Sequence, residues 1–141
     1  MQKKYVLGIG AANVDIHGKS RAKLNMRDSN PGFMTSSTGG VTRNVCENLA
    51  RLGNDAKLIT AVGDDVYAQK IKQDSVAAGI DISNIYVAEG CASSTYMTIL
   101  DENGDMLCAL SDMRILEKLP LSYLRSKIDL IKEAAVVTID P

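Results

Sequence analysis

Residues 39–53 read Gly-Gly-Val-Thr-Arg-Asn-Val-Cys-Glu-Asn-Leu-Ala-Arg-Leu-Gly, and this stretch decides the fold. Within it, apolar side chains recur at Val45, Leu49 and Leu52, which is the spacing of one helix face. A glycine follows, as is common after the last turn of a helix. We therefore predict a helix over residues 42–52 that begins just after two glycines, where a ligand can approach bare backbone.

Apolar runs flank this helix on both sides. Residues 5–12 form a short run that ends in small residues, and residues 56–63 form a second one. Such runs are typical of buried strands, and a helix between two of them indicates a βαβ unit in a parallel sheet. Another helix is expected over residues 66–78, where Asp64 and Asp65 can cap the first turn. The predicted fold class is α/β.

The rest of the chain carries weaker signals. Residues 13–17 alternate polar and apolar side chains and are expected to be extended, whereas residues 18–38 are polar and predict a loop or weak surface strands. The strongest hairpin signal is Asn103-Gly104. The other expected elements are strands at residues 85–88, 95–100 and 106–110, a helix at residues 121–133 and a buried strand at residues 134–140.

Composition excludes several classes of function. The 16 Lys and Arg residues nearly balance the 17 Asp and Glu residues, so no basic surface for nucleic acid is indicated. No apolar run approaches the roughly 20 residues of a membrane helix, and no signal peptide precedes the first strand. The three cysteines are widely spaced, which favours free thiols. We expect a cytoplasmic protein without nucleic-acid or membrane partners.

Two glycine-rich stretches lack the features of nucleotide-binding loops. Gly8-Ile-Gly10 follows a strand, but Asn13 stands in place of the third glycine and the residues after it are strand-like. Gly39-Gly40 is not followed by the Gly-Lys-Ser/Thr sequence of a P-loop. Neither stretch predicts a phosphate site.

Polar side chains gather at the end of the first strand instead. Asn13 and Asp15 have the period-two spacing that places both on one face, beyond a strand end where open α/β sheets bind ligands. Gly39 and Gly40 expose backbone, and Asn44 lies in the first turn of the predicted helix. Together they suit a polyhydroxylated ligand such as a sugar, to which a charged acceptor contributes about 1.5–3 kcal/mol per hydrogen bond. The alternative is that Asp15 and Asn44 are only turn and cap residues.

Residues 39–53 also resemble a family signature. Followed after nine residues by Gly63-Asp64-Asp65, they are similar to the first signature of the ribokinase (PfkB) family of carbohydrate kinases. Asn13-Val14-Asp15 is similar to the substrate-binding strand end of that family. The likeness runs from about residue 5 to the end of the chain.

This resemblance implies a fold and a domain organisation. The expected architecture is a three-layer, Rossmann-like (ribokinase-like) α/β sheet with a small β-sheet lid. Residues 16–38 and 91–112 would form the lid, and residues 1–141 would be the N-terminal part of a single kinase domain. The open edges of lid strands also predict a homodimer.

The same resemblance assigns substrate contacts. Carried over residue by residue, it makes Asp15, Gly39, Gly40 and Asn44 contacts of the ribose, with Asn13 beside them.

The narrower likeness within the family is to members that phosphorylate pseudouridine. It rests on residues 28–32, 39–44, 48–54, 61–63, 93–96, 100–101 and 112–113. Pseudouridine differs from uridine by an extra ring N–H donor, so a placed acceptor must discriminate between them. Ser29, Asn30 and Thr95 are candidates to contact the base. Their alternative roles are a turn for the first two and hairpin packing for Thr95.

The activity implied is ATP-dependent phosphorylation of the 5′-hydroxyl of a nucleoside, with pseudouridine as the expected substrate. ATP, Mg²⁺ and a monovalent cation are the implied cofactors. Two alternatives stay open: a kinase of the same family that acts on a free sugar such as ribose or on another nucleoside, and a non-catalytic nucleoside-binding module.

One family motif does not occur in the sequence. The catalytic base of the family is an Asp in a Gly-Ala-Gly-Asp motif beside the ATP site, and residues 1–141 contain no such motif. We therefore assign no catalytic residue and no metal ligand in this chain. The catalytic Asp and the ATP site are expected in a C-terminal half, and the chain alone is expected to be inactive. Asp64-Asp65 resembles a paired-carboxylate metal site, but helix capping explains it better.

Overall fold

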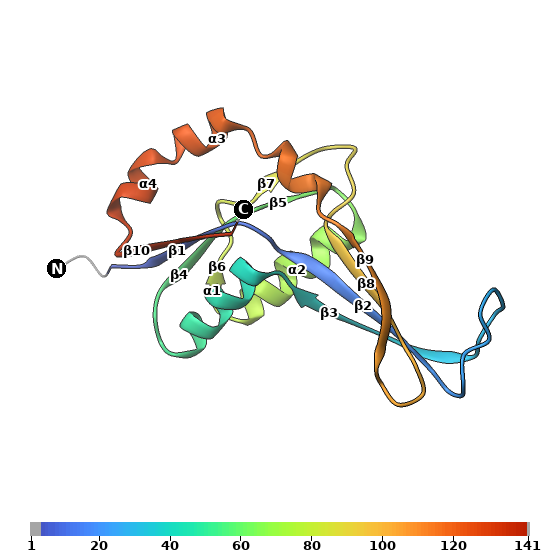
Figure 1. Cartoon of the computed structure of the whole chain (residues 1–141). Helices are drawn as coiled ribbons and strands as arrows, with labels where there is room; N and C mark the ends of the chain where they lie inside the picture. The colour runs from blue at the N-terminus through green and yellow to red at the C-terminus, as the bar shows by residue number, and fades with distance from the viewer. Residues whose placement is uncertain (1–3, 141) are drawn as a thin grey trace.

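A four-stranded parallel sheet lies at the centre of the molecule (Figure 1). The computed structural model describes residues 4–140, so residues 1–3 and 141 of the predicted domain lie outside the described residues. The sheet consists, in spatial order, of β10 (Val136–Ile139), β1 (Val6–Ile9), β4 (Ala56–Ile59) and β6 (Ile80–Asp81). All three strand pairings in it are parallel, as the βαβ pattern predicts.

Helices cover both faces of this sheet. The pair α1 (Val41–Arg51) and α2 (Val66–Ala77) lies on one face, and the pair α3 (Leu121–Ser126) and α4 (Ile128–Glu133) lies on the other (Figure 1). The expected three-layer α/β architecture is therefore confirmed.

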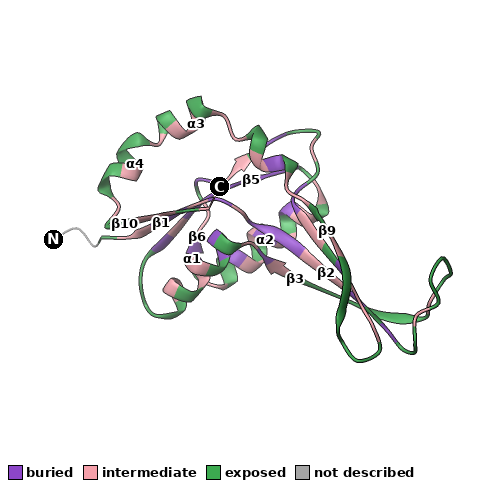
Figure 2. Ribbon diagram, in the orientation of Figure 1, coloured by how far each residue is buried: buried purple, intermediate pink, exposed green. Residues whose placement is uncertain are grey.

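The two helical layers differ in burial. Cys46 of α1 and Ile71 of α2 are fully buried and pack against Leu58 of β4. In contrast, α3 and α4 contain no buried residue (Figure 2). The main apolar core thus lies between the sheet and the α1–α2 layer.

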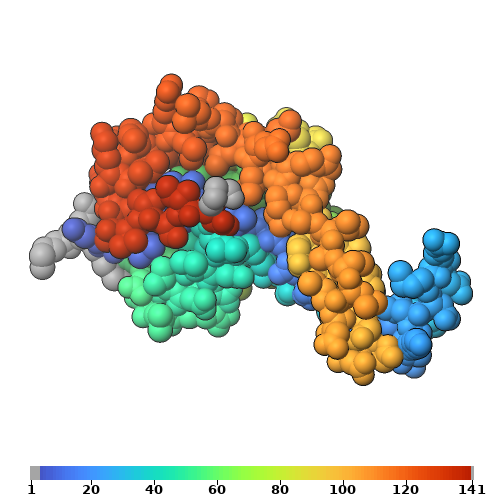
Figure 3. Space-filling view, in the orientation of Figure 1, coloured from blue at the N-terminus to red at the C-terminus, as the bar shows by residue number. Residues whose placement is uncertain are grey.

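A second sheet projects from this body, and we call it the lid sheet. Its strands, in spatial order, are β3 (Gly32–Gly39), β2 (Asn13–Ser20), β8 (Thr95–Leu100) and β9 (Met106–Asp112). The far ends of these strands stand out as two projections, the β8–β9 hairpin and the β2–β3 loop (Figure 3). Both predicted lid segments contribute strands to this one sheet.

Three short elements complete the described chain. The strands β5 (Ala61–Val62) and β7 (Tyr86–Val87) pair with each other as a separate parallel sheet. A 3₁₀ helix, η1 (Arg114–Lys118), follows the lid sheet and leads towards α3.

The predicted hairpin is confirmed. Gly104 has a φ of +94°, and the Asp101 carboxylate accepts hydrogen bonds from the amides of Asn103 and Asp105 at 2.8 and 2.9 Å. The turn between β8 and β9 therefore depends on the local sequence.

The expectation of a loop or weak surface strands at residues 18–38 is confirmed, because this segment contains a loop and most of β3, whose positions are largely exposed. Three other sequence expectations are corrected. The run at residues 56–63 breaks at Thr60, because β5 leaves the central sheet to pair with β7. The helix at residues 121–133 is interrupted at Lys127, where the backbone has φ −102° and ψ 16°.

The third correction concerns the last strand. β10 lies at an edge of the described sheet and is not buried, because Val136 and Ile139 are 57% and 69% exposed.

Asp65 provides a first testable prediction. Its carboxylate caps α2 by accepting the Ala68 amide at 2.8 Å, and it also accepts the Ser93 amide and hydroxyl at 2.9 and 2.7 Å. We expect Asp65→Ala to lower the free energy of unfolding by about 2 kcal/mol, the sum of a lost cap and unpaired donors. Denaturant unfolding at neutral pH measures this loss.

The effect of Asp65 should depend on pH. Burial raises the pKa of the Asp65 carboxyl, but the hydrogen bonds from Ser93 and Ala68 outweigh it and leave the pKa below its ordinary value. A carboxyl whose pKa is lowered in the folded state stabilises the fold at any pH above its pKa in the unfolded chain, which is about 3.9 for Asp. This contribution is lost as the pH falls through the pKa of the folded state. Asp64→Ala is the matched control, and an equal loss in both variants would contradict the prediction.

Candidate functional site

The two polar motifs of the sequence meet at the root of the lid sheet. β1 leads into β2, and β3 leads into α1 through Gly40 alone. The register of the antiparallel pair places Asn13 opposite Gly39 and Asp15 opposite Ser37. Residues far apart in sequence therefore lie side by side where the body joins the lid sheet.

The Asp15 carboxylate is oriented by its neighbours. Asn13 Nδ2 donates to Asp15 Oδ1 at 2.7 Å. A Cβ atom placed on Gly39 would lie 2.1 Å from Asp15 Oδ2, which no real structure tolerates. The carboxylate therefore occupies the space that a side chain at position 39 would fill. Gly39 is needed because Asp15 is there.

Position 40 requires a glycine because of its backbone conformation and the backbone atoms packed against it. It is the N-cap of α1 with a φ of +102°, and a Cβ on it would lie 2.4 Å from the carbonyl oxygen of Ala11. That same carbonyl accepts the Arg43 amide at 3.1 Å, which ties the first turn of α1 to the β1–β2 connection. The double glycine thus allows a close approach to Asp15 and a sharp entry into the helix.

The face of the lid sheet that carries Asp15 is rich in hydroxyl groups. In the register, Asp15 pairs with Ser37 and with Tyr96, so the three side chains share one face. On the same face His17 Nδ1 and Thr98 Oγ1 are 2.6 Å apart. We did not identify Tyr96 or Ser37 from the sequence, since their face depends on the pairing register.

Thr95 lies on the other face of this sheet. It pairs with Val14, one position from Asp15, and successive side chains of a strand point to opposite faces. The structure therefore does not bring the Thr95 side chain to the Asp15 carboxylate.

Ser29 and Asn30 lie at the far end of the lid sheet. Asp15 and Ser20 are five positions apart in β2, about 17 Å, and the loop extends beyond that. The Asn30 side chain closes the loop by accepting the Asn25 amide at 2.7 Å and donating to the Asn25 carbonyl at 2.9 Å. The structure does not place this pair beside Asp15, and it supports the turn interpretation.

Asn44 is the last of the predicted contacts. It lies in the first turns of α1, its side chain is exposed, and its Oδ1 accepts a hydrogen bond from Arg43 at 3.3 Å. Its backbone N–H donates to the Gly40 carbonyl at 2.9 Å, so Asn44 lies one helical turn after the double glycine that meets Asp15.

Comparison with known proteins identifies the family of the chain. Residues 3–140 match the pfkB family of carbohydrate kinases. The chain belongs to this family. Pseudouridine kinase of Escherichia coli (strain K12) is 40% identical over 139 residues, which is 99% of this chain and 44% of that protein. Guanosine-inosine kinase of Exiguobacterium acetylicum is 31% identical and matches 94% of this chain and 44% of that protein.

A solved structure shows the same fold. A carbohydrate kinase from Agrobacterium tumefaciens superimposes with a TM-score of 0.90 at 26% identity, over 97% of this chain and 45% of that one. The chain thus spans less than half the length of these pfkB relatives. The ribokinase-like fold of the chain is therefore shared with these carbohydrate and nucleoside kinases.

Among residues 4–140, no group of three or more His, Cys, Asp or Glu side chains could hold a metal ion. Asp64 Oδ2 accepts the Gly90 amide at 3.1 Å and Asp65 caps α2, so the capping interpretation of this pair is confirmed. We therefore assign no described residue to Mg²⁺, to a monovalent cation or to ATP. Within the same residues, no helix has the length and apolar character needed to cross a membrane.

Proposed function

We propose that the root of the lid sheet binds the ribose of a nucleoside, with pseudouridine as the preferred ligand. The observation that carries this proposal is the Asp15 carboxylate, which Asn13 holds in the space left open by Gly39. A fixed carboxylate accepts hydrogen bonds from two neighbouring hydroxyl groups, and Asn44 adds an amide from α1. The 40% identity to pseudouridine kinase supports this choice of nucleoside.

The kinase to which these residues belong would phosphorylate the 5′-hydroxyl with ATP as donor. The contribution of this chain is to hold the ribose in one orientation, which removes the cost of bringing the reacting hydroxyl into place. The Asp15 face of the lid sheet, with Tyr96 and Ser37, would cover the nucleoside and exclude water. No described residue is assigned to the transfer itself, and we expect the 141-residue chain to bind nucleoside without transferring phosphate.

Calorimetric titration of the chain tests the ligand. Pseudouridine is expected to bind more tightly than uridine, because an acceptor left unpaired against the wrong base is costly, and both should bind more tightly than free ribose. Equal affinity for ribose and the nucleosides would favour a sugar kinase, and no binding of any of them would refute the site.

Another nucleoside is a second candidate ligand, since guanosine-inosine kinase also matches 94% of the chain. Titration with guanosine and inosine under the same conditions separates the two substrates. A phosphotransfer assay of the chain, with and without the C-terminal half of a kinase that contains it, then separates the enzyme from a binding module.

A further inference from the structure

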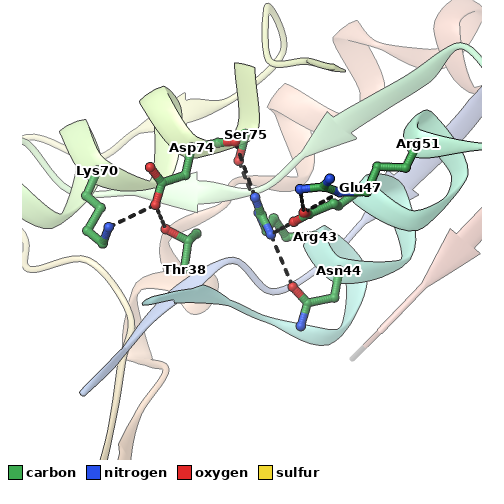
Figure 4. A network of polar contacts seen from close by, with 8 residues as sticks. All are labelled: Thr38, Arg43, Asn44, Glu47, Arg51, Lys70, Asp74 and Ser75. Atoms are coloured by element: carbon green, nitrogen blue, oxygen red, sulfur yellow. Dashed lines mark hydrogen bonds and ion pairs between the residues drawn. The ribbon is translucent and has the colours of Figure 1, made fainter. Parts of the chain in front are cut away.

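Arg43 is a buried cation beside Asn44. Its side chain is only 5% exposed, and it lies between α1 and α2 (Figure 4). Its guanidinium donates to Asn44 Oδ1 at 3.3 Å, to Ser75 Oγ at 3.4 Å and to the Asp74 carbonyl at 3.4 Å. It also forms an ion pair with Glu47. Partners on two helices therefore hold the guanidinium plane in one orientation.

This orientation decides how the Asn44 amide points. A guanidinium group has only donors, so the amide must turn its oxygen towards Arg43 and its Nδ2 away. Asn44 is exposed, so Nδ2 can donate to a ligand at the surface of the site. The site thus pairs an acceptor, the Asp15 carboxylate, with a donor, the Asn44 amide.

The same network is joined to the lid sheet. Thr38, near the end of β3, donates to Asp74 Oδ2 at 2.5 Å, and Lys70 donates to the same oxygen at 2.9 Å. These hydrogen bonds hold the pKa of the Asp74 carboxyl below its ordinary value, so it is an anion at neutral pH. The Asp74 backbone carbonyl in turn accepts a hydrogen bond from the Arg43 guanidinium. A groove of about 420 Å³ at this point is lined by residues of β3, α1 and α2.

We propose that Arg43 is a positioning residue that aims the Asn44 amide at a hydroxyl oxygen of the ligand. It acts through Asn44 and does not touch the ligand itself. The site then selects a ligand with two neighbouring hydroxyl groups that donate to Asp15, one of which also accepts a hydrogen bond from Asn44, as a vicinal diol can. The inference rests on the proposed nucleoside function, because Asn44 is a ligand contact only there.

A double-mutant cycle tests this role by titration of the chain with pseudouridine. Arg43→Met, which keeps an apolar stem but removes the donors, is expected to weaken binding about tenfold, and Asn44→Ala by a similar factor. Because one residue acts through the other, the double variant should lose no more than either single one. Arg51→Met is the matched control: it removes a cation of α1 that also pairs with Glu47, and binding should change less than twofold.

Further variants separate positioning from folding. Arg43→Lys keeps a positive charge near Glu47 but lacks the planar set of guanidinium donors. Relative to Arg43→Met, it should restore more of the melting temperature than of the nucleoside affinity. Asn44→Asp keeps an acceptor for Arg43 but has no donor, so it should fold normally and bind at least about tenfold more weakly.

The possible outcomes are distinguishable. Additive losses in the cycle, or wild-type affinity in Arg43→Met, would overturn the positioning role while nucleoside binding stands. Wild-type affinity in Asn44→Ala would remove Asn44 from the site and the inference with it. Absence of nucleoside binding by the unmodified chain would overturn the proposed function itself and, with it, this inference.

Discussion

Replacing Asp15 with alanine is expected to abolish useful nucleoside binding. The carboxylate is the charged acceptor of the site, and each hydrogen bond from a ligand hydroxyl to it is worth about 1.5–3 kcal/mol, so the loss of two should weaken binding about 100-fold or more. In a full-length kinase that carries these residues, kcat/KM should fall at least as much, because misplaced ribose also misplaces the 5′-hydroxyl. Calorimetry on the chain and steady-state kinetics on the kinase measure the two effects.

Two other variants make this experiment specific. Asp15→Asn keeps the shape of the side chain and one acceptor oxygen, so its nucleoside affinity should lie between those of the wild type and the alanine variant. Asp105→Ala removes the same charge from the exposed β8–β9 turn and should leave affinity unchanged. An unchanged dissociation constant in Asp15→Ala, for every nucleoside and sugar tried, would remove Asp15 from the site.

The sequence was sufficient to predict turns that need no tertiary partner and helices that bury one face. The helix after Gly40 was predicted from its apolar spacing, and α1 spans Val41–Arg51. The turn at Gly104 was predicted from Asn-Gly, whose positive φ needs no tertiary partner. Asp15 and Gly39 were both singled out from the sequence, but they meet through the antiparallel pairing of β2 with β3 in the lid sheet and not at the strand ends of the α/β sheet.

Features that depend on distant partners were not predictable in the same way. β3 is polar and exposed, so only its pairing with β2 defines it as a strand. The break at Thr60 arises because β5 finds a partner in β7, which no pattern within the run reveals.

The side-chain face of a lid strand has the same dependence. A shift of one residue in register exchanges the two faces, so the choice between Thr95 and Tyr96 needed the observed pairing. Asn30 illustrates a different limit. A side-chain amide can hydrogen-bond the edge of a base, but it can equally hydrogen-bond nearby backbone groups. In the structure the Asn30 amide closes a loop by binding the backbone of Asn25.

Gly39→Ala is expected to mimic the loss of Asp15 without unfolding the protein. The added Cβ would meet Asp15 Oδ2 at 2.1 Å and Cγ at 2.8 Å, so the carboxylate must rotate away and give up its 2.7 Å bond from Asn13. A short side chain can move more cheaply than backbone, so the melting temperature should fall only slightly while nucleoside affinity falls about 100-fold, as in Asp15→Ala.

The dependence of Gly39 on Asp15 gives this prediction its control. In an Asp15→Ala background the alanine at position 39 meets no carboxylate, so it should cause little further loss of affinity. Gly18→Ala adds the same methyl group to the lid sheet, but its closest neighbour is the flexible end of Met34, at 3.0 Å from the sulfur, and Ile99 lies at an ordinary contact distance of 3.6 Å, so binding should stay intact. Two results would show that the proposed geometry of the ribose site is wrong. One is wild-type affinity in Gly39→Ala, and the other is an equal loss of affinity when Gly39→Ala is added to the Asp15→Ala variant. Either would mean that Gly39 is not needed to make room for the carboxylate.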